Sequence, residues 1–384
     1  MARGEVSVSR VWYERLRREV RRGGGMFNAH LHLDRVGTFD DRYLPGTGHR
    51  MEEDFHVSLK RKHAMIADLH AGPAFDRDDF FARVEGALAE MVAVDTRRAD
   101  TMVDVTTHPR VGLTDLEWMQ EIKARWADRI DLRLGAYTPF GFDDAEPARW
   151  DIFTEGARRA DFIGCLPEAD DTDDYPSHIG FSEHCRRLLE LAQDLGKMVH
   201  VHTDQRFEAG EFGTERLIEA IRRYGAPQAE DGEPMVWAVH MVSPSTYDEA
   251  RFWRLADDMA ELNVGLIACP SAALGMRMLR PLQAPTGNCM PRILELLSRG
   301  VAVRLGSDNI ADICSPSTTP DLVDEAFVLS AALRFYQPEI MARLLCGQRL
   351  EASERAFVAE HLRKNDEEIR YALAKHRTRP PQMD

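Results

Sequence analysis

The chain has 384 residues, 44% of them hydrophobic, which is enough for one large α/β barrel. Its formal net charge is −15 at pH 7, and no basic stripe runs along it, so nucleic acid is not expected as a partner. The six cysteines form no CxxC pair, which argues against a disulfide framework and against a zinc ribbon.

The sequence also lacks the usual signals for membranes and export. No segment reaches about 18 uninterrupted apolar residues, and charges run throughout the first 25 residues. We therefore expect a cytoplasmic protein that contacts no membrane and whose partner is a small molecule. A homo-oligomer is compatible with this composition.

Short apolar runs alternate with polar loops and helix-like stretches along the chain, a pattern typical of βα units around a parallel sheet. The eight predicted strands are residues 26–33, 101–107, 130–136, 162–166, 197–202, 235–240, 264–268 and 301–306. Eight strands, each followed by a helix, favour a closed (β/α)₈ TIM barrel over an open doubly wound sheet.

We expect a single domain over residues 1–384, without a substantial β-sandwich. Residues 1–25 are predicted to form an N-terminal helical extension, and residues 320–384 are predicted to form C-terminal helices. Within that tail, helices are expected at 321–336 and 338–375.

The first predicted strand ends in two histidines, His30 and His32. Their spacing of two places both imidazoles on one face of the strand. In a barrel of this kind, reactive groups lie at the carboxyl ends of the strands. Both side chains are therefore expected at the barrel mouth, where they can hold one ion.

Three later strands also end in ionisable or ligating residues. His200 and His202 end the fifth strand, His240 ends the sixth, and Asp308 follows the eighth. Either His200 or His202 can be the ligand from the fifth strand, and the position of His202 nearer the mouth favours it. Imidazoles with one carboxylate form the ligand set expected for one zinc ion, with Fe(II) as the alternative.

The motifs around these positions, in order and spacing, resemble the amidohydrolase superfamily, most closely its branch of cytosine deaminases and triazine aminohydrolases. The resemblance is carried by HLHLD at 30–34, TTHPRVG from Thr106, DLRLGAYTP, GCLPE, VHVHTDQ, AVH and GSDN. It implies that His30, His32, His202 and Asp308 bind the metal. It further implies that His240 stands beside the attacking water and that Asp308 takes a proton from that water.

One departure from the family concerns proton transfer. Deaminases of the family have a glutamate three residues after the fifth-strand histidine, and this chain has Gln205 there, which cannot ionise. Gln205 can orient the substrate while His240, Asp204 or Glu168 moves the proton. Alternatively, the substrate has a leaving group that needs no acid.

Four residues near the predicted mouth are candidate substrate-binding residues: Asn309, Glu168, His108 and Asp204. Members of the resembled superfamily with two metals often have a carboxylated lysine at the fourth strand, and this chain has none there, so the resemblance implies a mononuclear site. Four further histidines recur every seven residues between the first two strands, at positions 49, 56, 63 and 70. Because no second ligand type accompanies them, they are predicted to be surface residues.

The leading hypothesis is a metal-dependent hydrolase that cleaves a C–N bond of a small nitrogen heterocycle and releases ammonia or an amine. A second hypothesis is hydrolytic opening of a cyclic amide, lactam or imide. A third is a metal-binding pseudoenzyme that senses a small molecule.

Overall fold

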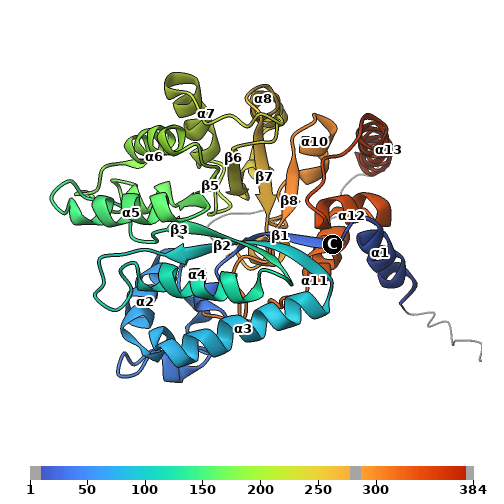
Figure 1. The fold of residues 1–384 in the computed structure, drawn as a ribbon. Helices are drawn as coiled ribbons and strands as arrows, with labels where there is room; N and C mark the ends of the chain where they lie inside the picture. Colours follow the sequence, from blue (N-terminus) through green and yellow to red (C-terminus); the bar gives the residue numbers. More distant parts are fainter. Residues whose placement is uncertain (1–9, 277–286, 378–384) are drawn as a thin grey trace, which may run out of the picture.

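A barrel of eight parallel strands forms the centre of the molecule, with strand order β1-β2-β3-β4-β5-β6-β7-β8 (Figure 1). The computed structural model describes residues 10–276 and 287–377. The strands are β1 (Met26–Leu31), β2 (Thr96–Asp104), β3 (Asp131–Tyr137), β4 (Phe162–Cys165), β5 (Val199–Thr203), β6 (Val236–His240), β7 (Val264–Ala268) and β8 (Val303–Leu305). This confirms the expected (β/α)₈ fold.

Helices surround the sheet and bury its outer face (Figure 1). They are α1 (Val11–Arg22), α2 (Leu59–Ala71), α3 (Arg77–Ala93), α4 (Thr114–Trp126), α5 (Ala148–Arg159), α6 (Phe181–Leu195), α7 (Gly213–Tyr224), α8 (Glu249–Glu261), α9 (Pro270–Leu274), α10 (Ile293–Ser298), α11 (Leu322–Leu333), α12 (Pro338–Leu345) and α13 (Ala352–Arg377). Short 3₁₀ turns include η1 (Leu33–Arg35) and η5 (Pro167–Asp170). None of the described helices is long and apolar enough to cross a membrane.

Alternation along β5 shows how the sequence positions the site. Val199 and Val201 belong to the main apolar core, together with helical side chains such as Leu188. His200 and His202 point the other way, and the His202 ring centroid lies 4.8 Å from that of His30. The strand thus buries its valines against helices and turns its imidazoles into the barrel.

The barrel closes where β8 meets β1. His32 N donates to Asp308 O at 3.2 Å, and Asp308 N donates to His30 O at 2.9 Å. A Cβ atom at Gly306 would lie 2.8 Å from the backbone oxygen of His30, so only glycine permits this close approach. Closure therefore brings the Asp308 carboxylate next to the histidines of β1.

Most predicted strand ends differ from the structure by one to three residues, and two differences are larger. β2 begins at Thr96, five residues before the predicted start. The charged residues at its beginning do not resemble a strand in the sequence, but Arg98 donates to Asp100 and stacks on the Phe27 ring. The predicted helix over 338–375 is two helices, α12 and α13, separated at Gly347 with a φ of +67°, a conformation that favours glycine.

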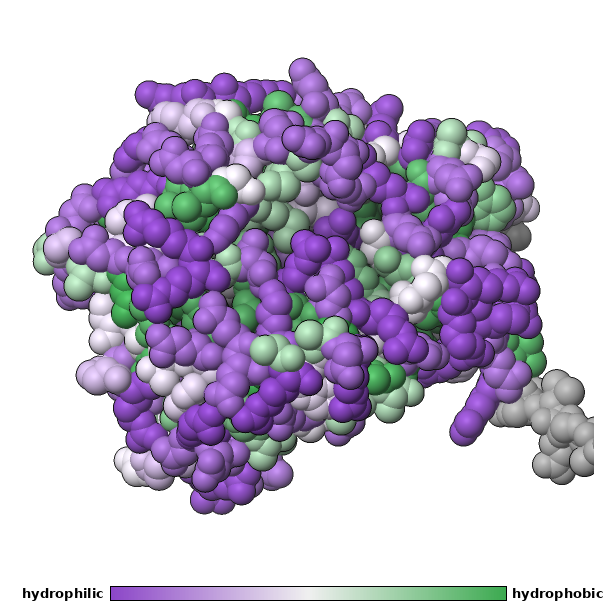
Figure 2. Space-filling view, viewed as in Figure 1, coloured by the Kyte–Doolittle hydropathy of each residue, from purple (hydrophilic) through white to green (hydrophobic). Residues whose placement is uncertain are grey.

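The segments flanking the barrel lie together in space. α1 packs on α12, and α13 packs on α10 (Figure 1). Residues 1–9 of the predicted extension over 1–25, and residues 378–384 of the predicted tail over 320–384, lie outside the described part of the chain. Among the residues that the structure describes, the barrel is the only β-sheet. The face seen in Figure 2 is mostly hydrophilic, with scattered small apolar patches.

Candidate metal centre and active site

The ends of β1, β5, β6 and β8 bring four histidines and one aspartate together. Potential ligand atoms of His30, His32 and His202 lie within 4.8 Å of one another, and so do those of His30, His240 and Asp308. Asp308 Oδ1 is 3.7 Å from His30 Nε2 and 3.5 Å from His32 Nε2. These five predicted site residues therefore form one buried cluster.

The backbone turns sharply where the cluster residues leave their strands. His240 has a φ of +76° and Asp308 a φ of +59°, and Asp204, just after β5, has a φ of +58°. Residues other than glycine rarely adopt this left-handed backbone conformation, because it costs them free energy. Here it ends the strand alternation and directs His240 and Asp308 towards the other ligands.

The carbonyl of Cys165 on β4 fixes the tautomer of His202. His202 Nδ1 lies 2.8 Å from this oxygen, so Nδ1 carries the proton and Nε2 keeps its lone pair for an ion. His200, the alternative ligand, packs against the Phe162 ring at 4.5 Å and belongs to neither group of potential ligands. The geometry thus favours His202.

The histidines are neutral in this environment. Burial lowers the pKa of His202 and of His240 to about 3, and lowers the pKa of His30 well below its usual value. Both ring nitrogens of His30 are buried without a hydrogen-bond partner. Buried polar atoms are rarely left unpaired, and neutral imidazoles are the form that binds metal. The donor set therefore fits a divalent ion.

Arg35 contacts the cluster through His32. Its Nη2 contacts His32 Nδ1, and because arginine only donates, this contact places the proton of the neutral ring on Nε2. An ion bound at His32 Nε2 requires the opposite tautomer. We expect Arg35 to turn then towards Asp34 and Asp104, whose carboxylate oxygens lie 3.9 and 3.8 Å from Arg35 Nε.

A buried polar network supports this side of the cluster. Asp34 Oδ2 accepts from the backbone N of Asp104 at 2.8 Å, and Asp104 Oδ2 lies 2.8 Å from His70 Nε2. Burial and the neighbouring Asp104 carboxylate raise the pKa of Asp34 to about 7. His70 was predicted to lie at the surface, and that prediction was wrong, since α2 buries it completely.

A cavity of about 490 Å³ opens above the cluster, and we call it the metal pocket. Its walls include His32, His202, His240 and Asp308, together with the predicted residues Gln205 and Asn309. Burial and the nearby Asp312 carboxylate raise the pKa of Asp308 to about 7. Asn309 donates from Nδ2 to Asp312 Oδ2, which holds its amide at the pocket wall.

Gln205 and Glu168 form a pair beside the metal pocket. Gln205 Nε2 donates to Glu168 Oε2 at 2.9 Å. Glu168 Oε1 is buried and has no hydrogen-bond partner. A carboxyl group from η5, directly after β4, thus lies one hydrogen bond away from the side chain at position 205.

Two predicted substrate-binding residues have other surroundings. Asp204 accepts from Gly213 N at 2.6 Å and from Thr214 N at 2.8 Å, so both of its oxygens hold the start of α7. His108 lines a separate cavity next to Phe140 and does not reach the metal pocket. Neither position supports a direct role in binding a substrate at the ion.

Sequence reasoning missed His63. It was predicted to lie at the surface, but α2 crosses the barrel mouth and His63 lines the metal pocket. Burial lowers its pKa to about 3, so the ring is neutral. His49 pairs with Asp54, and His56 is exposed but also lines the metal pocket. Two of the four histidines at sevenfold spacing, His56 and His63, therefore lie at the site.

Arg110, in the motif that begins at Thr106, is exposed and forms an ion pair with Asp76. It does not line the metal pocket. The structure thus gives Arg110 the role of a surface arginine.

Comparison with known proteins relates this fold to solved enzymes. No protein-family model matches the chain. A curated uncharacterized protein from Haemophilus influenzae is 27% identical over 259 residues, 67% of this chain and 85% of its own.

Three solved structures share the barrel. One is 5-methylcytosine deaminase from Klebsiella pneumoniae with phosphonocytosine, with TM-score 0.70, 21% identity, and coverage of 84% of this chain and 73% of the other. Another is N-isopropylammelide isopropylaminohydrolase from Burkholderia multivorans, with TM-score 0.62, 18% identity, and coverage of 88% of this chain and 82% of the other. The third is a mutant atrazine chlorohydrolase from Arthrobacter aurescens complexed with zinc and atraton, with TM-score 0.51, 14% identity, and coverage of 86% of this chain and 68% of the other.

The chain thus shares its (β/α)₈ barrel fold with these solved enzymes. The fold implied by the sequence motifs is thereby confirmed. The motif positions 30–34, 202, 240 and 308 all lie at one end of this barrel, as expected for a site built on strand ends.

Proposed function

We propose that this protein is a hydrolase that uses one divalent metal ion to cleave a C–N bond of a small nitrogen heterocycle. The observation that carries the proposal is the buried cluster of neutral imidazoles and one carboxylate at the barrel mouth. The activities of the structural neighbours, a 5-methylcytosine deaminase and an N-isopropylammelide isopropylaminohydrolase, agree with this chemistry.

His30, His32, His202 and Asp308 would hold the ion, and zinc suits these ligands, with Fe(II) as the alternative. When bound, the ion supplies a strong Lewis acid that lowers the pKa of water towards about 7. Each proposed ligand comes from a strand end, which keeps the ligand geometry rigid.

The side chains of the chain itself would then act on water and substrate. Asp308 accepts a proton from the attacking water, and His240 orients that water. Asn309 and Gln205 bind polar edges of the ring from the pocket wall. Because the cluster is buried, these interactions take place away from bulk water, where electrostatic stabilisation is stronger.

Metal content and turnover test the proposal together. The purified protein, loaded with Zn²⁺ or Fe²⁺ and checked by elemental analysis, is incubated with amino-pyrimidines, alkylamino-triazines, pterins and cyclic amides. Release of ammonia or an amine from at least one ring supports the proposal. Full metal occupancy without turnover of any substrate contradicts it.

Product analysis separates the alternative of ring opening. Opening a cyclic amide or imide adds water without releasing ammonia or an amine. Mass spectrometry therefore shows a product heavier than the substrate by the mass of one water molecule in that case. If no compound is hydrolysed but one raises the melting temperature of the protein, the result supports the third hypothesis, a metal-binding pseudoenzyme that senses a small molecule.

A further inference from the structure

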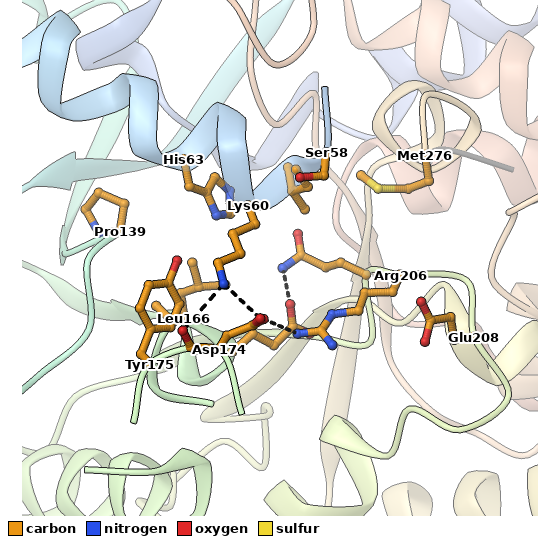
Figure 3. A pocket seen from close by; sticks show the side chains of 14 residues that line it. Ser58, Lys60, His63, Pro139, Leu166, Asp174, Tyr175, Arg206, Glu208 and Met276 are labelled. Carbon is orange, nitrogen blue, oxygen red and sulfur yellow. Dashed lines mark hydrogen bonds and ion pairs between the residues drawn. The ribbon is translucent and has the colours of Figure 1, made fainter. Parts of the chain in front are cut away.

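A second cavity of about 240 Å³ lies beside the metal pocket, and we call it the side cavity (Figure 3). The two cavities share the side chains of Leu59, His63, Gln205 and Met276. A molecule bound at the ion can therefore extend past these residues into the side cavity.

The walls of the side cavity combine apolar side chains with one ion-paired rim. The apolar members are Leu59, Pro139, Leu166, Ala169, Tyr175 and Met276. At the rim, Lys60 from α2 lies 2.8 Å from Asp174, and Arg206 lies 3.3 Å from the same carboxylate (Figure 3). These charges satisfy one another, so the cavity suits a small apolar substituent better than an ion.

Glu168 is the polar group that the side cavity leaves unsatisfied. It lines this cavity, and its Oε1 is buried without a partner, while Oε2 accepts from Gln205. A buried carboxyl oxygen without a partner needs an explanation, such as a ligand that it binds. Glu168 thus lines the side cavity and is hydrogen-bonded to Gln205, which lines both cavities.

The surroundings of Glu168 favour its protonated form. Burial and the carboxylates of Glu211 and Asp204 raise its pKa to about 8, against the hydrogen bond from Gln205 and the charge of Arg206. The charged and titratable groups around it are Lys60 and His63 on α2, Asp174 and Tyr175 after η5, and Asp204, Arg206, Glu208 and Glu211 after β5. A protonated carboxyl group can donate where Gln205 cannot.

We propose that the side cavity receives the departing group of the substrate, a small alkylamine, and that Glu168 donates the proton with which this amine leaves. The inference rests on the proposed function and names its leaving group. It assigns the acid role to Glu168, which follows β4, in place of the residue at position 205.

The reaction balances with these groups. The water oxygen forms a bond to the ring carbon, and Asp308 takes one proton of the water. The C–N bond then breaks, its electron pair stays on nitrogen, and the Glu168 proton completes the neutral alkylamine. The ring keeps the hydroxyl group, and the proton on Asp308 passes through solvent to restore Glu168.

Substitution of the carboxyl groups tests the acid role. E168Q keeps the size and the hydrogen bond to Gln205 but has no acidic proton, so kcat should fall by roughly 10²–10⁴-fold. E190Q alters an exposed carboxylate on α6 that lines neither cavity and should change kcat by less than about 3-fold. The double variant E168Q/Q205E places a carboxyl group at position 205, which lines both cavities, and should recover activity, whereas equal rates for E168Q and wild type contradict the proposal.

Infrared spectroscopy provides a readout that needs no substrate. The wild-type protein at pH 6.5 should show the carbonyl band of a protonated carboxylic acid that E168Q lacks, and this band should vanish as the pH rises through about 8. No difference between wild type and E168Q overturns the inference whatever the turnover. Absence of any turnover by metal-loaded wild type, with the band present, refutes the proposed function and the assigned leaving group.

Rings with graded substituents test the cavity. The wild type should hydrolyse alkylamino rings faster than the same rings bearing an unsubstituted amino group. The variant A169L, which fills the side cavity, should remove this preference while leaving the metal content unchanged. Equal rates for both substituents in the wild type contradict the role of the cavity.

Discussion

His202 Nδ1 lies 2.8 Å from the carbonyl oxygen of Cys165, on the neighbouring strand β4. The backbone of one strand thereby fixes the proton of a ring on the next. The ring presents Nε2 to the cluster without any side chain to hold it. His200, two residues earlier on the same strand, has no such partner at either nitrogen.

This difference predicts unequal effects of two alanine substitutions. H202A should weaken metal binding by more than roughly 100-fold, beyond the usual loss of an outer-sphere partner. H200A removes a buried ring but no proposed ligand, so folded H200A should retain stoichiometric metal. Elemental analysis after gel filtration measures both, and metal loss confined to H200A would reverse the assignment.

His63 should affect substrate binding but not the ion. It lines the metal pocket from α2 and belongs to neither group of potential ligands. We expect H63A to raise KM by on the order of 10-fold, the value of about one lost hydrogen bond to a bound ligand. H49A, on the same stretch but paired with Asp54, serves as the matched control and should leave KM unchanged. A drop in metal content for H63A would instead assign it to the ion.

Arg35 should be critical for stability. It is buried next to Asp34 and Asp104, both of which are also buried. Removing one member of a buried charged group leaves the others uncompensated, so R35A should lower the free energy of unfolding by about 3–5 kcal/mol. R110A breaks an exposed ion pair with Asp76 and should cost less than about 1 kcal/mol. Urea denaturation of both apo variants compares them, and similar losses would disprove the prediction.

Asp115 should make stability depend on pH. Neither of its carboxylate oxygens has a hydrogen-bond partner, and burial, with Asp34 and Asp104 nearby, raises its pKa to about 9. The folded state therefore holds this proton more tightly than the unfolded state does. The contribution of Asp115 to the free energy of unfolding is therefore greatest below about pH 4. It decreases by about 1.4 kcal/mol per pH unit as the pH rises to about 9.

The variant D115N tests this linkage because it cannot ionise. Its free energy of unfolding should exceed that of wild type at pH 8, and the difference should shrink at pH 5. Urea denaturation at both pH values measures the two slopes. Parallel slopes for wild type and D115N would show that another group controls the pH dependence.

The sequence predicted the barrel and its ligand cluster well because both depend on local pattern. Valines and histidines alternate along β5, and parallel strands all end at one rim, so the pattern alone placed His202, His240 and Asp308 together. Strand ends with charged residues were harder. The start of β2 around Arg98 escaped detection because its charge is paired with Asp100 on the same strand and stacked on Phe27 of β1.

Residues whose role depends on long-range packing could not be predicted. His63 reaches the site because α2 crosses the mouth, and no pattern within 59–71 indicates this. Asp204 looked like a substrate contact because it follows His202, but the left-handed backbone turns it to the start of α7. Glu168 was a candidate from its place after the fourth strand, but its hydrogen bond with Gln205 could not be predicted from the sequence.

Because α2 lies at the barrel mouth, the residues that would hold the ion and some of the residues that line the cavities belong to different elements. The proposed ion ligands are fixed by the strands and by the closure of the barrel at Gly306, so few substitutions there are tolerated. Leu59 and His63 belong to a helix outside the barrel and face both cavities. Substitutions at these two positions should thus reshape both cavities while leaving the proposed ion ligands in place.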